Sequence, residues 1–166
     1  MYVAAFNLRV RTHNQVSKMS IFHPDNVFDY FTENIPHASG DEEAYLSAIA
    51  RYAKESGLPV TADLAEERVG GGIRPKRELF LVLTPTEKRI RRYSSYHFGR
   101  PLGATLNVGW YLVGKVSAGG LGGWAIAGGA MQGDIDGLEA LIHVVHEAAV
   151  IPAIREIAGA ASVKSM

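Results

Sequence analysis

The C-terminal part of the sequence carries the side chains best suited to metal chemistry. With 100° between successive helical residues, four of them share one face, namely Glu139, His143, His146 and Glu147. Imidazoles three residues apart with carboxylates beside them can bind zinc, iron or manganese, and a carboxylate can also act as a general base. One helix supplies too few ligands, so His97 or Asp25 would have to complete the site. A solvated polar helix face explains the same pattern, and both interpretations stay open.

A second group combines positive charge with aromatic rings. The run contains the cations Lys88, Arg89, Arg91 and Arg92, followed by the rings of Tyr93 and Tyr96. Cations neutralise phosphates and rings stack on bases, so the run predicts an anion-binding strand for nucleic acid, a phosphorylated ligand or an acidic lipid. The alternatives are an edge strand that uses charge against aggregation, and pairing with acidic helices of the same chain.

Charge is segregated along the chain although the totals cancel, with 17 Lys and Arg against 17 Asp and Glu. From Arg74 to Arg100 there are eight basic and two acidic residues, whereas Asp25 to Glu67 contains ten acidic and two basic residues. Net neutrality provides no general attraction to polyanions, so any anion binding must be local.

The composition excludes several classes of protein. The chain has no cysteine, which excludes a disulfide scaffold, thiolate-bound metals and a cysteine nucleophile, and which fits a cytoplasmic location. A Gly-x-Ser-x-Gly motif is also absent. We therefore expect a non-enzymatic binding or assembly module, while enzymatic activity stays open. The alternatives are a small metal-dependent enzyme that uses the histidine pair, and a protein that binds an apolar ligand between a sheet and the terminal helix.

The first part of the chain predicts a strand and a short helix. Residues Phe6 to Arg11 alternate apolar with polar side chains, which is typical of a half-buried strand and unlike a signal peptide. Asp25 is expected to cap a helix that carries Val27, Phe28 and Phe31 and ends before Pro36.

A clearer helix follows. Ser39 and Glu42 have the spacing of a capping box, and Gly57 with Pro59 supplies a stop. Between them runs an apolar stripe at helical spacing, formed by Tyr45, Ala48, Ile49 and Tyr52. Ala62 to Val69 predicts a further short helical piece, and the glycines at 70–72 predict a loop.

The middle of the chain predicts an antiparallel meander of three strands. Its runs cover residues 79–83, 89–98 and 104–116, and the intervening segments Thr84 to Thr86 and Gly99 to Pro101 are expected to be turns. Leu121 to Met131 stays open between a fourth strand and a loop, because glycines there disfavour a helix.

A long helix is predicted at the C-terminal end. Asp136 is expected to cap it with Glu139 as the partner three residues later, and Pro152 must kink or end it. Residues 160–166 are predicted to be a frayed tail. The buried stripe is expected to contain Leu138, Leu141, Ile142, Val145 and Ala149.

Together these elements predict a single domain over residues 1–166 of the α+β class. An antiparallel sheet of three to five strands is covered by helices on one face, with a long helix at the C-terminal end. This order loosely resembles the helix-grip fold, and a resemblance at that level implies an architecture and no activity.

Pro101 to Gly133 is an apolar stretch with one charged residue, Lys115. Its many glycines, together with Asn107 and Ser117, argue against insertion into a membrane, which requires about 20 strongly apolar residues. We expect a buried sheet core here, or a surface covered by a second copy, so the sequence predicts a soluble homo-oligomer.

Overall fold

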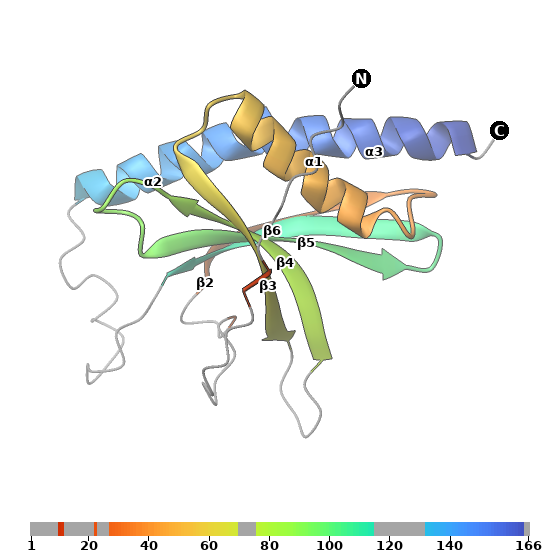
Figure 1. Cartoon of the computed structure of the whole chain (residues 1–166), viewed down its shortest axis with the longest axis horizontal. Helices are drawn as coiled ribbons and strands as arrows, with labels where there is room; N and C mark the ends of the chain where they lie inside the picture. The colour runs from red at the N-terminus through yellow and green to blue at the C-terminus, as the bar shows by residue number, and fades with distance from the viewer. Residues whose placement is uncertain (1–9, 12–21, 23–26, 70–75, 115–131, 165–166) are drawn as a thin grey trace.

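The computed structural model describes residues 10–11, 22, 27–69, 76–114 and 132–164 of the chain (Figure 1). Its strands lie side by side in one sheet in the order β1-β3-β4-β5-β6-β2. The strands are β1 (Val10–Arg11), β2 (Val27–Ile35), β3 (Val60–Val69), β4 (Lys76–Pro85), β5 (Tyr93–Leu102) and β6 (Thr105–Gly114). The helical segments are α1 (Glu42–Glu55), α2 (Gln132–Val145), η3 (His146–Val150) and α3 (Ile151–Lys164).

Five strands of the sheet are antiparallel, and the two-residue β1 runs parallel to β3. α1 and the C-terminal helix lie across one face of this sheet (Figure 1). The predicted α+β class, with an antiparallel sheet under helices and a long C-terminal helix, is confirmed. Of the predicted strand from Phe6 to Arg11, only β1 is described. The remainder of that strand lies outside the described residues, as do Asp25, the glycines at 70–72 and Leu121 to Met131.

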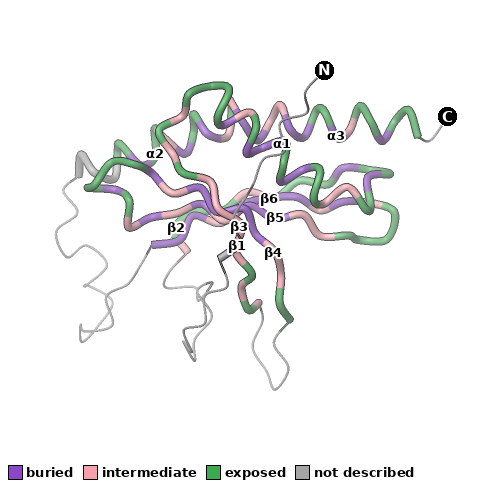
Figure 2. Tube along the Cα trace, in the orientation of Figure 1, coloured by how far each residue is buried: buried purple, intermediate pink, exposed green. Residues whose placement is uncertain are grey.

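The main core lies between these helices and the sheet, and buried residues occur along both the helices and the central strands (Figure 2). Tyr45 and Ile49 of α1 are fully buried there, as are Leu81 of β4, Leu106 of β6 and Val150 of η3. Removing this apolar surface from water is the main force that holds the helices on the sheet.

The opposite face of the sheet carries a smaller aromatic cluster, because successive strand residues point to opposite sides. Phe80 and Phe98 are buried there, with Tyr96 and Tyr111 packed against them. The ring of Phe22 lies 4.8 Å from that of Phe80, centre to centre, and covers part of this cluster.

α1 confirms the clearest predicted helix. Its buried side includes the predicted Tyr45, Ala48 and Ile49. The chain leaves the helix at Gly57, which has a φ of 63°, a left-handed conformation that glycine adopts at the least cost. The start differs slightly from the prediction, because Asp41 and not Ser39 occupies the N-cap position before Glu42.

Two segments predicted as helical are strands, so both predictions are wrong. Val27 to Phe31 begins β2, where Phe31 lies opposite Trp110 of β6. Ala62 to Val69 lies within β3, where Leu64 is opposite Leu81 of β4. The physical reason is that a short segment gains more from pairing with a distant strand than from its own weak helical preference.

The three strands of the meander are confirmed, but the expected turns between them are wrong. Gly99 to Pro101 lies inside β5, and the chain reverses at Gly103 and Ala104, where Gly103 has a φ of 62°. Thr84 and Pro85 belong to the end of β4. The chain then turns over residues 86–92, so the first part of the predicted second strand is a turn instead.

α2, η3 and α3 follow one another without a break from Gln132 to Lys164. The helix thus begins before the predicted cap at Asp136, and it continues through residues 160–164, where a frayed tail was expected. The expected apolar stripe is confirmed, with Leu138, Ile142, Val145 and Ala149 buried and Leu141 partly buried.

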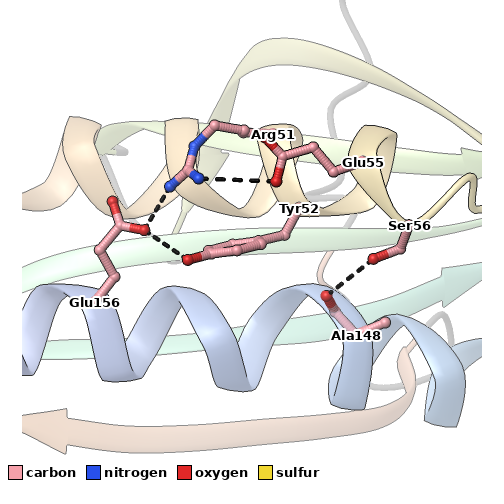
Figure 3. A network of polar contacts seen from close by, with 6 residues as sticks. All are labelled: Arg51, Tyr52, Glu55, Ser56, Ala148 and Glu156. Carbon is pink, nitrogen blue, oxygen red and sulfur yellow. Dashed lines mark hydrogen bonds and ion pairs between the residues drawn. The ribbon is translucent and has the colours of Figure 1, made fainter.

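Pro152 does not end this helix, because a wider helical turn accommodates it. In the π-helical segment η3, the Ile151 N–H donates to the carbonyl of His146, five residues earlier. Proline has no N–H to donate to the carbonyl four residues before it, which here belongs to Ala148. The Ser56 hydroxyl at the end of α1 donates to that carbonyl instead, at 3.5 Å (Figure 3).

Candidate functional site

The predicted cations lie in the turn between β4 and β5, hereafter the basic turn (Lys88, Arg89, Arg91 and Arg92). Lys88, Arg89 and Arg91 are exposed, and Arg92 is partly buried. Between them, Ile90 is buried in the main core and accepts a hydrogen bond of 2.9 Å from the Tyr93 N–H. The turn is therefore anchored by one apolar side chain while three of its cations meet solvent.

None of these cations forms an ion pair with a described residue. The Arg92 guanidinium lies 5.3 Å from the centre of the Tyr93 ring, and its Nε is buried without an acceptor in the described part of the chain. The turn itself contains one acid, Glu87, which is exposed. Within the described part of the chain, the positive charge of Lys88, Arg89 and Arg91 thus has no ion-pair partner.

The two tyrosines predicted as stacking groups are not presented beside the exposed cations. Tyr93 is 6% exposed and belongs to the main core. Tyr96 lies on the opposite face of the sheet, where its ring is 5.4 Å from that of Phe22. Burial, and secondarily the charge of Glu67, raises the pKa of Tyr96 to about 12. Neither ring is free to stack on a base next to the basic turn.

Phe28 is the aromatic residue that sequence reasoning missed. It is 43% exposed, and its ring lies 5.4 Å from that of Tyr93 in an edge-to-face arrangement. The sequence places Phe28 on the apolar side of an expected helix. Its actual position follows from the pairing of β2 with β6, which is irregular between Val27 and Asp29.

The way the terminal helix lies on the sheet turns one predicted metal ligand, His146, away from the other three. Glu139, His143 and Glu147 are exposed. His146 is turned toward the sheet, where its ring is 4.6 Å from that of Phe31 and its Nδ1 accepts a long hydrogen bond of 3.4 Å from Trp110 Nε1–H. Within the described residues, no three His, Asp or Glu side chains are grouped to hold a metal ion. The metal site stays a prediction.

His97, one of the two residues suggested to complete the metal site, is fully buried in β5. Its Nε2 lies 2.9 Å from the hydroxyl of Ser95, and its Nδ1 has no hydrogen-bond partner in the described structure. Burial, and then the nearby His146, lowers the pKa of His97 to about 3. The ring is therefore neutral at physiological pH, and it lies beneath the helix with Trp110 directly across on β6.

Comparison of the chain with models of known protein families, and with curated proteins, finds no match. The interpretation of the site thus depends on its chemistry and geometry.

One helix among the described residues, Asp136–Lys164, is long and apolar enough to cross a membrane by length and composition. In the most apolar stretch of 18 residues within this helix, 33% of the residues are buried inside the protein. A core helix of a soluble protein passes the same test, so the helix by itself decides nothing about membranes.

Proposed function

We propose that this protein is a binding module that holds an anionic partner at the basic turn. The observation that carries the proposal is the presence of Lys88, Arg89 and Arg91 in one anchored turn, exposed and without ion pairs to described residues. Exposed cations that are close together attract phosphate, sulfate or carboxylate groups, and they lose little internal bonding when such groups bind.

The arrangement of the acidic residues supports the same proposal. Pairing with acidic helices of the same chain is one of the two alternative uses of these cations, but several acids pair elsewhere. Glu156 binds Arg51, Asp41 binds Lys164, and Glu78 binds Arg100. The acids of the first half of the chain and of the last helix are therefore partly neutralised without the basic turn.

Heparin is a suitable probe because it is a polyanion without bases or lipid chains. The wild-type protein should bind it with an affinity that falls as salt rises, since binding releases counterions. The triple variant Lys88→Gln/Arg89→Gln/Arg91→Gln should bind at least about tenfold more weakly, with a flatter dependence on salt.

A control variant, Lys54→Gln/Lys76→Gln/Arg77→Gln, removes the same number of charges at exposed positions outside the turn. It should keep most of the affinity. Equal losses in both triple variants would contradict a localised site, and an absence of heparin binding by the wild type would refute the proposal. The predicted homo-oligomeric state and cytoplasmic location stay predictions.

A further inference from the structure

An exposed apolar ring stands beside the basic turn. The Tyr93 ring contacts the Arg92 guanidinium, at 5.3 Å, and also the ring of Phe28, at 5.4 Å. The start of β2, the end of β6 and the turn between β4 and β5 lie at the same end of the sheet (Figure 1). Phe28 and the three exposed cations therefore share one end of the molecule.

Local structure holds Phe28 in this position. The pairing of β2 with β6 is irregular between Val27 and Asp29, so Phe28 packs toward Tyr93. Gly114 leaves the room for this, because a Cβ at that position would lie 2.4 Å from the Phe28 ring. The backbone thus fixes a large apolar side chain that is 43% exposed, although its exposure to water is unfavourable.

The shape of this surface favours a lipid bilayer over a nucleic acid. Proteins that bind single strands use a basic groove with several rings on which successive bases stack. Here the cations lie on a turn, Tyr93 is buried, and Tyr96 is on the other face of the sheet. One exposed phenyl ring beside a cluster of Lys and Arg is typical of proteins that bind the interface of an acidic membrane.

The positive charge of the basic turn would attract an acidic membrane surface. Among the described residues, the acids nearest in sequence to these features are Glu87 in the turn and Asp29 beside Phe28, and the Asp29 carboxylate accepts a hydrogen bond from the Tyr30 N–H. The basic turn therefore provides an excess of positive charge for the headgroups of anionic lipids.

We infer that the anionic partner of the basic turn is the headgroup layer of an acidic membrane, into which the Phe28 ring inserts. This inference depends on the proposed function, because the same cations supply the attraction. Two layers of the bilayer interact with the cations and with the Phe28 ring. The headgroups neutralise Lys88, Arg89 and Arg91, and the acyl region takes up the phenyl ring.

The test is cosedimentation with vesicles. The wild-type protein should bind vesicles of phosphatidylcholine and phosphatidylserine, and it should bind pure phosphatidylcholine far more weakly. Lys88→Gln/Arg89→Gln/Arg91→Gln should lose roughly 100-fold in partitioning, and this loss should shrink in high salt. Phe28→Ser should lose about fivefold, and salt should not change that factor.

Tyr30→Ser supplies the matched control for the ring. Tyr30 lies two residues further along the same strand and is 67% exposed, but it is paired with Tyr111 and not with the basic turn. Its replacement should leave vesicle binding unchanged. Circular dichroism of each variant would confirm that the fold is intact.

The outcomes separate this inference from the proposed function. Binding of heparin without binding of phosphatidylserine vesicles would overturn the membrane and leave the anion site in place. Binding of neither probe would overturn both. Tighter binding of single-stranded RNA than of vesicles, or equal effects of Phe28→Ser and Tyr30→Ser, would also overturn the membrane inference.

Discussion

The imidazole of His97 is neutral because it is buried, and this makes the stability of the protein depend on pH. Its pKa is lowered from 6.5 to about 3 in the folded protein, by burial and then by His146. Between these two pH values the unfolded chain binds the extra proton and the folded protein does not. The free energy of unfolding should therefore fall as pH decreases through this window, by up to about 1.4 kcal/mol per pH unit for one proton.

Urea unfolding at several pH values checks this prediction. In His97→Gln the contribution of this residue to the pH slope should disappear. If His97→Gln and the wild-type protein lost stability in parallel between pH 6.5 and pH 4, the proton would have to be taken up elsewhere.

Gly109 is required by the close approach of β2 to β6. A Cβ at this position would lie 2.2 Å from the Phe31 carbonyl oxygen, which is a backbone atom, and 2.9 Å from Cζ of Phe98. Gly109→Ala should therefore shift the edge strand and lower the free energy of unfolding by about 1–3 kcal/mol.

Gly137→Ala in α2 is the control, since a Cβ there meets nothing within 4 Å. It should raise stability by roughly 0.5–1 kcal/mol, because alanine favours a helix. Thermal unfolding of the two variants checks this prediction. A shift of both melting temperatures in the same direction would contradict it.

At the scale of elements, α1 and the C-terminal helix are joined by polar contacts as well as by the core. Glu156 of α3 accepts hydrogen bonds from Arg51 and from the hydroxyl of Tyr52, the latter at 2.8 Å (Figure 3). These contacts lower the pKa of Glu156, the hydrogen bond from Tyr52 first, then that from Arg51. Arg51 and Glu156 are each a little under half exposed, so solvent screens their charges and we expect the network to add little to stability.

The contact between Ser56 and Ala148 predicts a coupling to Pro152. In the wild type, Ser56→Ala should cost about 0.5–1.5 kcal/mol, because the Ala148 carbonyl loses the donor that replaces the missing proline N–H. In Pro152→Ala the backbone N–H at position 152 becomes available, so the same serine change should cost almost nothing. A double-mutant cycle measured by urea unfolding gives this difference. Equal costs in both backgrounds would show that the hydroxyl does not act through that carbonyl.

The elements that could be predicted from the sequence are those whose pattern is long and local. The apolar stripes of α1 and of the terminal helix are read within one segment, and the runs of β4 and β6 are rich in residues that favour strands. β3 could not be predicted, because its Ala, Glu and Arg residues favour a helix. Its pairing with β4 joins two separate segments, and a local pattern within β3 does not reveal it. The same holds for β2, whose partner β6 is far away in sequence.

The candidate site was predictable in composition but not in geometry. The sequence identifies the cluster of cations from Lys88 to Arg92, but it assigns them to a strand. A turn places the cations at one end of the molecule and leaves Tyr96 on the far side of the sheet. Phe28 could not be identified because its exposure depends on an irregular strand pairing and on Gly114, which are properties of the assembled sheet.

At the scale of the whole molecule, the sheet is divided into two parts. β3 and β4 pair along their whole length, as do β5 and β6, but β4 and β5 are joined only where Leu81, Val82 and Leu83 lie opposite His97, Tyr96 and Ser95. Beyond these residues the hairpin of β3 and β4 diverges from β5 (Figure 1). An ion pair spans the gap, with Arg100 Nε donating to Glu78 at 2.8 Å, and the Arg100 guanidinium lies 4.0 Å from the centre of the Phe98 ring.

This division predicts that the two parts of the sheet open with different free energies. Amides of β4 from Lys76 to Phe80 should exchange with solvent through local opening, because β3 is the only strand paired with this part of β4, whereas those of β5 and β6 should exchange only near global unfolding. Glu78→Gln removes the charge that spans the gap, so it should speed exchange in the hairpin and leave β6 unchanged.

Arg77→Gln is the control, because its ion pair with Glu66 lies within the hairpin and does not cross to β5. Hydrogen exchange followed by NMR resolves these amides one by one. If β4 and β6 exchanged with one common free energy, the sheet would unfold as a single unit, and the ion pair between Glu78 and Arg100 would have no role in holding its two parts together.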